Sequence, residues 1–191
     1  MPHRPMQPLR TICVYCGSQP GTDPDFVSAA REFGKVLAEN KVSLVYGGGS
    51  VGLMGELADS VLKHGGKVTG IIPDFLTGPE RMLLSAQEMI VTKDLHERKR
   101  LMFEHSDAFV ALPGGVGTLE ELVEQLTWEQ LGHHQKPILL ANLKGFWQPL
   151  LALVAQMREH RFIPDHYPVR FLTADSVGEI LPKLQAANNS N

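Results

Sequence analysis

The sequence predicts one α/β domain with a doubly wound, Rossmann-like parallel sheet that is covered by helices on both faces. Short, almost purely apolar runs alternate with amphipathic stretches along nearly the whole chain, and strands buried on both faces have this composition. The length of 191 residues suits a single core, and no linker divides it. We therefore expect a single nucleotide-binding domain over residues 11–186, a flexible N-terminus over 1–10 and a frayed polar tail over 187–191.

The expected elements follow one another in the order that such a sheet requires. The predicted strands are Thr11–Cys16, Ser43–Tyr46, Lys67–Ile72, Met89–Thr92, Ala108–Leu112, Pro137–Ala141 and a last one near Val169–Leu172. The predicted helices are Asp25–Asn40, Gly52–His64, Leu95–His105, Leu119–Leu131, Phe146–Glu159 and Ser176–Ala186. The segment Phe75–Ala86 has only a weak helical pattern, so we expect a mobile loop or a short helix there.

Composition excludes several classes of protein. A formal net charge of −3 gives no reason to expect a nucleic-acid partner. No run approaches the roughly 20 apolar residues of a membrane span, and Met1–Arg10 lacks the apolar centre of a secretory signal. Two cysteines cannot build a disulfide scaffold. These features predict a cytoplasmic protein without a membrane partner.

Two glycine-rich turns follow predicted strands, at the edge of the sheet where ligands bind. The first is Gly47-Gly48-Gly49-Ser50-Val51-Gly52, and the second is Pro113-Gly114-Gly115-Val116-Gly117-Thr118. Glycine lets the backbone approach a phosphate closely, and the helix behind it offers unpaired N–H groups and a partial positive charge. One such turn is often only a tight connection. Two at equivalent places, which we expect to lie side by side, favour a phosphate site.

Known phosphate motifs leave a second interpretation open. Neither turn ends in Gly-Lys-Ser/Thr, so triphosphate hydrolysis lacks its lysine and its magnesium ligand. Gly47, Gly49 and Gly52 fit G-x-G-x-x-G, and Asp74 ends the next strand, which is consistent with a dinucleotide site. Against that interpretation, the dinucleotide turn usually follows the first strand of its unit. A dinucleotide site would also leave the Pro113 turn without a function.

Charged residues near the turns have both a structural and a functional interpretation. Arg98 and Lys99 border the apolar face of their helix and either extend along its edge or, for Arg98, reach over the strand ends. Arg100 points toward solvent. Glu121 completes a capping-box pattern with Thr118, but a hydrolase that activates water also needs a carboxylate beside its anion site. Spacing alone does not decide between these interpretations.

Two motifs taken together resemble one known family. Pro113-Gly-Gly-Val-Gly-Thr-Leu-Glu-Glu121 matches a PGGxGTxxE motif, and Leu95-His-Glu-Arg-Lys99 followed by Met102 matches a motif around an arginine and a lysine. With these motifs the chain resembles the Lonely Guy (LOG) family of cytokinin riboside 5′-monophosphate phosphoribohydrolases. The likeness runs from about Thr11 to Leu184 and includes Tyr46–Gly55, Cys16–Ser18 and Thr127–Gly132.

The resemblance implies an enzyme that hydrolyses the N-glycosidic bond of AMP or N6-prenylated AMP to free base and ribose 5-phosphate, without a metal or other cofactor. It implies that Arg98 and Glu121 form the catalytic pair. The other implied substrate- and phosphate-binding residues are Ser18, Gly47, Gly48, Gly49, Gly52, Met54, Glu80, Lys99, Pro113, Gly114, Gly115, Val116, Gly117, Thr118 and Thr127. Glu80 corresponds only by its position in a loop, and Val116 stands where plant members often have tyrosine.

The resemblance also implies a homodimer that pairs through helices. The alternative to an enzyme is a non-catalytic nucleotide- or cofactor-binding module, because related folds carry the molybdenum cofactor without hydrolysing it. The presence of both Arg98 and Glu121 favours the enzyme. Members of the family were once labelled lysine decarboxylases. That reaction needs pyridoxal phosphate on a Schiff-base lysine, and nothing marks Lys93, Lys99 or Lys144 as such a residue.

Other patterns are interpreted as structural. Cys13 and Cys16 are an odd number of residues apart on a strand, so they should face opposite sides of the sheet and form no bridge. His133-His134 lies at a helix end and is expected at the surface. A helical stripe, interpreted as core or as dimer interface, consists of Leu150, Leu151, Val154 and Met157.

Overall fold

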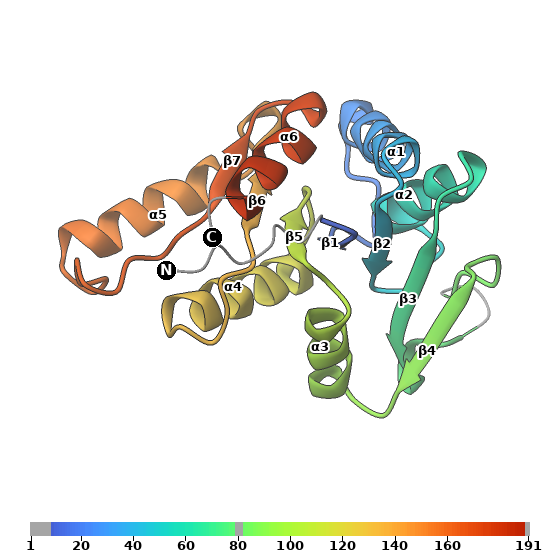
Figure 1. Ribbon diagram of the computed structural model, residues 1–191, viewed down its shortest axis with the longest axis horizontal. Helices are drawn as coiled ribbons and strands as arrows, with labels where there is room; N and C mark the ends of the chain where they lie inside the picture. The colour runs from blue at the N-terminus through green and yellow to red at the C-terminus, as the bar shows by residue number, and fades with distance from the viewer. Residues whose placement is uncertain (1–8, 79–81, 190–191) are drawn as a thin grey trace.

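The computed structural model describes residues 9–78 and 82–189, and within these ranges seven parallel strands form one sheet (Figure 1). The strands are β1 (Thr11–Tyr15), β2 (Ser43–Tyr46), β3 (Val68–Pro73), β4 (Glu88–Thr92), β5 (Ala108–Ala111), β6 (Ile138–Ala141) and β7 (Leu172–Ala174). Their order across the sheet is β4-β3-β2-β1-β5-β6-β7, and every neighbouring pair is parallel.

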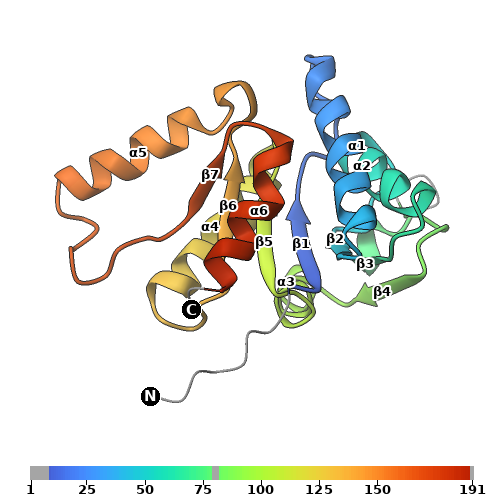
Figure 2. The same cartoon turned by 45° about the horizontal axis from the view of Figure 1, so that its top comes forward.

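The helices cover both faces of this sheet, so the doubly wound prediction is confirmed. They are α1 (Pro24–Glu39), α2 (Gly52–Lys63), α3 (Leu95–Glu104), α4 (Val116–Gln130), α5 (Gln148–Glu159) and α6 (Val177–Asn188). Helices α1, α2 and α6 pack on one face, and α3, α4 and α5 lie on the other (Figure 2). Two short 3₁₀ helices, η1 (Asp74–Leu76) and η2 (Leu143–Gly145), follow β3 and β6.

Strand periodicity divides the core into two apolar clusters. In β1, Ile12 and Val14 pack with α1 and α2, whereas Cys13 and Tyr15 pack with α3 and α4, because successive side chains point to opposite faces. Cys16 belongs to the first cluster, and both cysteines are buried and free. The prediction that the two thiols face opposite sides is therefore confirmed.

The strand order brings three connections to one edge of the sheet. From β1 the chain steps outward to β4, returns through α3 to β5 on the other side of β1, and then steps outward again. The two glycine turns follow β2 and β5 and therefore flank the end of β1. The prediction that they lie side by side is wrong, because β1 lies between the two strands that precede them. Gly17, just after β1, joins them: its N–H donates to Pro113 O at 3.0 Å, and its carbonyl accepts from Met54 N at 3.2 Å.

The last strand begins later than predicted. β7 begins at Leu172 instead of near Val169, because Val169 and Phe171 pack on the α4 side of the core while Arg170 N donates to Glu129 Oε2 at 3.3 Å. For the segment after β3 we expected a mobile loop or a short helix. The structure has a short 3₁₀ helix there, η1 at Asp74–Leu76.

The chain ends are more ordered than predicted where they are described. Leu9 is buried, and the backbone N–H groups of Arg10 and Thr11 donate to Asp107 Oδ2 at 2.9 Å. α6 extends to Asn188, so the first two residues of the expected frayed tail are helical. Residues 1–8 of the expected flexible N-terminus lie outside the described ranges, as do residues 190–191 of the tail.

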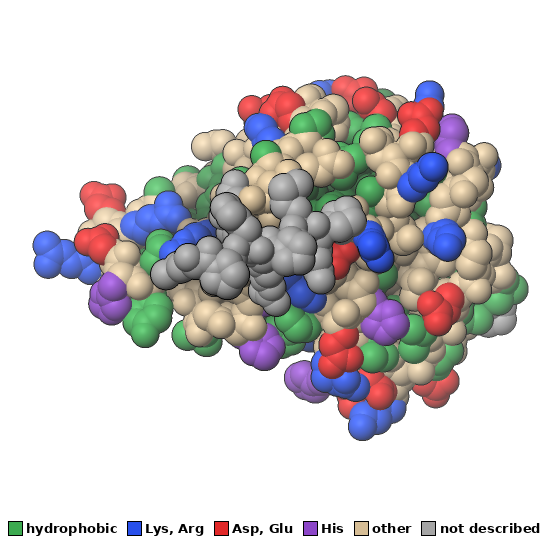
Figure 3. Space-filling model, in the orientation of Figure 1, with side chains coloured by type: hydrophobic (Ala, Val, Ile, Leu, Met, Phe, Trp, Pro, Cys, Tyr) green, Lys and Arg blue, Asp and Glu red, His purple; other side chains and the backbone are tan. Residues whose placement is uncertain are grey.

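Charge is distributed without a large area of one sign on the face in Figure 3, where basic and acidic side chains are interspersed. None of the helices in the described part of the chain combines the length and the apolar composition that crossing a bilayer requires.

Candidate active site

A cavity of about 510 Å³ opens at the carboxyl ends of β1, β2, β3 and β5, next to the N-terminus of α4. Ligands bind at this place in open parallel sheets, and the volume is ordinary for a small-molecule site. The predicted site residues that line it are Ser18, Gly47, Gly49, Met54, Arg98, Gly115, Val116, Gly117, Thr118 and Glu121. The sequence therefore identified much of the wall, including both residues of the expected catalytic pair.

The second glycine turn offers an open helix N-terminus to this cavity. Gly115 is the N-cap of α4, with extended backbone angles and no side-chain cap, and the first intrahelical bond runs from Leu119 N to Gly115 O. The N–H groups of the preceding first-turn residues therefore have no partner within the helix. A side chain at Gly115 or Gly117 would meet no described atom within 4 Å, so the backbone is accessible to an anion.

The glycines of the first turn make room for neighbouring groups and do not open a helix N-terminus to the cavity. A Cβ atom on Gly47 would lie 2.1 Å from Arg98 Nη2, so glycine at this position leaves room for the guanidinium group. Gly52 has φ +65°, and a Cβ there would lie 2.3 Å from Ser18 C. At α2, one first-turn amide, that of Met54, already donates to Gly17 O. Of the two turns, the one before α4 is thus the better anion site.

Arg98 is held by the backbone on one side and faces a carboxylate on the other. Side chains cap the start of α3: the N-cap Asp94 accepts from Glu97 N at 2.8 Å, and Glu97 accepts from the N–H of Lys93, the residue before the cap, at 2.9 Å. Arg98, in the next position, donates from Nε to Ile71 O at 3.1 Å and from Nη2 to Gly47 O at 3.3 Å. It therefore reaches over the strand ends, which decides between its two interpretations.

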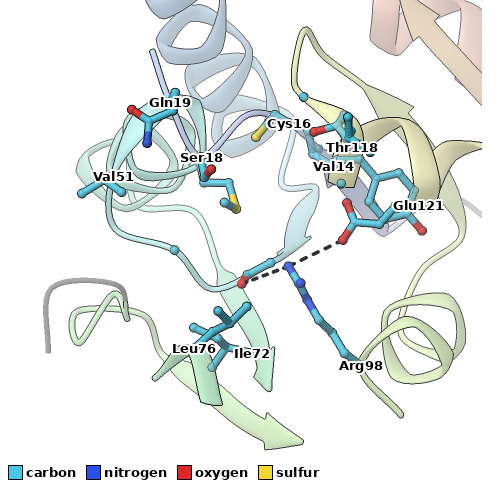
Figure 4. A pocket seen from close by; sticks show the side chains of 17 residues that line it. Val14, Cys16, Ser18, Gln19, Val51, Ile72, Leu76, Arg98, Thr118 and Glu121 are labelled. Atoms are coloured by element: carbon cyan, nitrogen blue, oxygen red, sulfur yellow. Dashed lines mark hydrogen bonds and ion pairs between the residues drawn. The ribbon is translucent and has the colours of Figure 1, made fainter. Parts of the chain in front are cut away.

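Glu121 faces Arg98 from α4 (Figure 4). Its Oε1 lies 3.5 Å from Arg98 Nη2, and both side chains are only 12% exposed. The capping-box interpretation is wrong, because α4 begins at Val116 and not at Leu119 as predicted, so that Thr118 lies inside the first turn. Glycine at 115 and 117 allows this earlier start, and Glu121 consequently projects from the second turn into the cavity.

Burial changes the acidity of Glu121. Desolvation raises the pKa of its carboxyl to about 7, although the positive charge of Arg98 acts in the opposite direction. A carboxyl group with a pKa near neutrality exchanges protons readily at physiological pH, which is the property expected of a general acid or base.

Several residues implied by the resemblance lie elsewhere. Lys99 is buried beside α4, where its Nζ contacts Glu120 and Glu124, and Thr127 Oγ1 donates to Val123 O on the exposed side of α4. Neither lines the cavity, because each projects from its helix in a different direction from the catalytic pair. Gly48, Gly52, Pro113 and Gly114 shape the turns without lining it. Glu80 lies outside the described residues.

Sequence analysis missed part of the wall. The additional lining residues are Val14, Tyr15, Cys16, Gln19, Val51, Ile72 and Leu76. Most come from the ends of β1 and β3, which carry no glycine motif. The rule that ligands lie beyond strand ends applies to these strands as well, and it was the signal available to find them.

The prediction that His134 lies at the surface is wrong. It is buried against Phe103 and Phe109 and not exposed, and desolvation lowers its pKa to about 4. Its Nδ1 accepts from Lys136 N at 3.1 Å. The ring is therefore part of the core below α4, whereas His133 is exposed as predicted.

Comparison with known proteins identifies the family. A family model described as "Possible lysine decarboxylase" matches residues 54–184. The chain is 47% identical over 180 residues to the "Probable cytokinin riboside 5′-monophosphate phosphoribohydrolase LOG4" of Oryza sativa subsp. japonica, covering 94% of this chain and 78% of that protein. It is 43% identical over 177 residues to the "Cytokinin riboside 5′-monophosphate phosphoribohydrolase LOG1" of Arabidopsis thaliana, covering 93% of this chain and 83% of that protein. The chain belongs to this family.

Solved structures with the same fold are more distant. The molybdenum cofactor binding protein of Rippkaea orientalis matches with a TM-score of 0.71 and 22% identity over 93% of this chain and 96% of that one. The molybdenum cofactor carrier protein of Chlamydomonas reinhardtii matches with a TM-score of 0.70 and 21% identity over 94% and 98%. At this identity the likeness shows the Rossmann-like fold alone.

Proposed function

We propose that this member of the family hydrolyses the N-glycosidic bond of a cytokinin riboside 5′-monophosphate, releasing the free base and ribose 5-phosphate. The observation that carries the proposal is the buried pair of Arg98 and Glu121, 3.5 Å apart, beside the open N-terminus of α4. Among the described cavity-lining residues, Arg98 is the only cation and Glu121 the only carboxylate. Such a pair suits a substrate with an anion at one end and a developing cation nearby.

The 5′-phosphate binds at the N-terminus of α4. The amides of Val116, Gly117 and Thr118 have no intrahelical acceptor, and the helix dipole favours an anion there. No cavity-lining lysine in the described ranges competes for this role. The same fact argues against the decarboxylase label, since that chemistry needs a Schiff-base lysine.

Glu121 supplies the chemistry at C1′. The C1′–N bond breaks and its electron pair leaves with the base, so positive charge develops on the ribose, as in glycoside hydrolysis. The ionised carboxylate stabilises that charge and orients a water molecule. The water oxygen then forms the new bond to C1′, its proton passes to Glu121, and the departing base takes a proton from solvent.

Arg98 orients Glu121 and the ribose phosphate. Its guanidinium is fixed by the carbonyls of Ile71 and Gly47, so it contributes its charge without losing much side-chain entropy when the substrate binds. The base lies toward the apolar wall of Val51, Ile72 and Leu76, across the cavity from Thr118 and Glu121 (Figure 4). An apolar wall favours an adenine that carries a prenyl group over plain adenine.

The test is to incubate the protein with AMP and with isopentenyladenosine 5′-monophosphate and to follow the free base by chromatography. We expect release from the prenylated nucleotide at the higher kcat/KM, with Glu121→Gln as the inactive control. Nucleotide binding without release from either substrate would contradict the proposal and favour a non-catalytic binding module. Equal release by the control variant would contradict the role of Glu121.

We further propose that the chain forms a homodimer through α4. Val116, Leu119 and Val123 lie at helical spacing on one side of α4 and are 82%, 36% and 42% exposed, and Val116 also lines the cavity. Exposed apolar side chains that share one helix face are suited to contact with another protein surface. Of the stripe predicted on α5, Val154 is buried and Met157 is 38% exposed, so that helix serves the core in part. Light scattering tests the proposal: Val123→Glu should convert a dimer to a monomer, whereas a monomeric parent protein would contradict it.

A further inference from the structure

A second set of ion pairs connects α3 and α4 beside the catalytic pair. Lys99 Nζ lies 2.5 Å from Glu120 Oε1 and 2.8 Å from Glu124 Oε2. The Lys99 side chain is 8% exposed, that of Glu124 is 21% exposed and that of Glu120 is 56% exposed. The contact with Glu124 is therefore largely protected from water and is not one of the loose surface pairs that contribute little to structure, whereas Glu120 contacts the lysine from the solvent side.

The geometry couples these contacts to the catalytic pair. Arg98 and Lys99 are consecutive on α3. Glu120 and Glu124 are four residues apart and share one face of α4, with Glu121 next to Glu120. The same two helices are therefore joined by two adjacent sets of contacts, of which one faces the cavity and the other lies outside it. Holding Lys99 against α4 fixes how far Arg98 lies from Glu121.

Lys99 is poorly placed to bind the substrate itself. It does not line the cavity, and its ammonium group already has two carboxylate partners. This arrangement differs from the substrate-binding role that the family resemblance implies for it. The position of Lys99 behind Arg98 instead suggests that it acts through its neighbours.

Lys99 also compensates two negative charges near Glu121. The titratable and charged groups around Glu121 are Arg98 and Lys99 from α3, Glu120 and Glu124 from α4, and Cys13, Tyr15 and Cys16 from β1 and its end. Glu120 and Glu124 disfavour a third carboxylate at Glu121, whereas Lys99 favours it. Loss of Lys99 alone leaves the two neighbouring carboxylates uncompensated.

We propose that Lys99 is a positioning residue, which fixes α3 against α4 through Glu120 and Glu124 and so holds Glu121 in place beside Arg98, while its positive charge favours the carboxylate form of Glu121. This inference rests on the proposed phosphoribohydrolase function, because it assigns Lys99 to that same site. It distinguishes Lys99 from Arg98, although the two are adjacent in one motif.

The kinetic test uses Lys99→Met, the conservative Lys99→Arg and the double variant Lys99→Met/Glu124→Gln, with isopentenyladenosine 5′-monophosphate as substrate. For Lys99→Met we expect kcat to fall by about 10- to 100-fold, as for a small misplacement of catalytic groups, with KM changed by less than about threefold. The acid limb of its pH–rate profile should move to higher pH. Lys99→Arg should recover most of kcat, and adding Glu124→Gln should move the limb back.

Contrary outcomes are equally specific. Lys99→Met could instead show a large rise in KM with kcat retained, and adding Glu124→Gln could have no effect. That result would show that Lys99 binds the nucleotide directly and would overturn the proposal. If Lys99→Met does not fold, Glu124→Gln alone remains informative. That variant removes one negative charge near Glu121, so the acid limb should move to lower pH, and an unmoved limb counts against the proposal.

A readout independent of turnover separates this proposal from the proposed function. The carboxyl carbon of Glu121 is followed by NMR in protein with ¹³C-labelled glutamate, and its signal is identified by its loss in Glu121→Gln. Lys99→Met should raise the pKa of Glu121, and Glu124→Gln should lower it. Absence of base release by the parent protein would count against the proposed function, while unchanged titration in both variants would count against the role of Lys99.

Discussion

The guanidinium Nη2 of Arg98 lies 3.5 Å from Glu121 Oε1, in a site where each side chain is 12% exposed. The two residues come from helices on the same face of the sheet, and Arg98 is anchored to the ends of β2 and β3 while Glu121 stands on the second turn of α4. An ion pair this protected from water is strongly affected by any change in its protonation. The first three predictions below depend on it.

Replacement of Glu121 by glutamine should abolish most activity while leaving the fold intact. The amide matches the carboxylate in size but carries no charge and accepts no proton, so kcat should fall by about 10²- to 10⁴-fold. The measurement is base release under saturating substrate, beside circular dichroism of the variant. Near-normal turnover in a folded variant would assign the chemistry to another residue.

Activity should rise with pH through neutrality. Burial raises the pKa of Glu121 to about 7, and the proposed mechanism uses the ionised form, so kcat/KM should increase as pH passes from about 6 to about 8. The second pKa of the substrate phosphate, near 6, is followed separately by ³¹P NMR. A rate that falls over this range would indicate that protonated Glu121 acts as the acid for the departing base.

The same group should make the stability of the protein depend on pH. The pKa of Glu121 is about 7 in the folded protein, against its ordinary value of 4.5, so between these values the folded state binds more protons than the unfolded state. The free energy of unfolding contributed by this group is therefore fully present below about pH 4.5 and falls as pH rises to about 7.

Glu121→Gln removes this dependence. The free energy of unfolding of the parent should therefore fall by about 3 kcal/mol between pH 4.5 and pH 8, because each pKa unit corresponds to 1.36 kcal/mol and the pKa of Glu121 is raised from 4.5 to about 7. The variant lacks this fall, so its advantage in stability over the parent should be about 3 kcal/mol larger at pH 8 than at pH 4.5. Urea unfolding of both proteins at the two pH values measures this change. A difference between parent and variant that is the same at both pH values would contradict the raised pKa.

Gly47→Ala should reduce activity through Arg98. The added Cβ would lie 2.1 Å from Arg98 Nη2, so the guanidinium must move away from Gly47 O and Glu121, and we expect kcat to fall by at least about tenfold. Gly178→Ala in α6 is the matched control, because its Cβ meets no described atom within 4 Å.

In that control, activity should be unchanged and stability should rise by about 0.5–1 kcal/mol, the usual gain for alanine over glycine in a helix. Base release and thermal unfolding of the two variants provide the comparison. Unchanged activity in Gly47→Ala would show that Arg98 can leave its present position without cost.

Local pattern predicted the elements well where the pattern was strong. The strand Ser43–Tyr46 has the same bounds in the structure as in the prediction, because an apolar run between polar residues has few alternatives. The start of α4 was predicted three residues late, because Gly115 and Gly117 were assigned to a turn. A glycine costs a helix only about 1 kcal/mol relative to alanine, so the remaining interactions of α4 outweigh this cost.

The sequence by itself determined the doubly wound class and the two glycine turns, because periodicity and motif spacing are local properties of the chain. The pair of Arg98 and Glu121 was implied by the resemblance of its motifs to a known family, since spacing alone left both residues with two interpretations. Only the tertiary structure decided which interpretation of each charged residue holds. Arg98 and Lys99 are consecutive and both border the apolar face of α3, yet Arg98 faces the cavity and Lys99 contacts Glu120 and Glu124 outside it. That difference depends on how α3 packs against α4. The spacing of residues within one helix does not determine how that helix packs against another one.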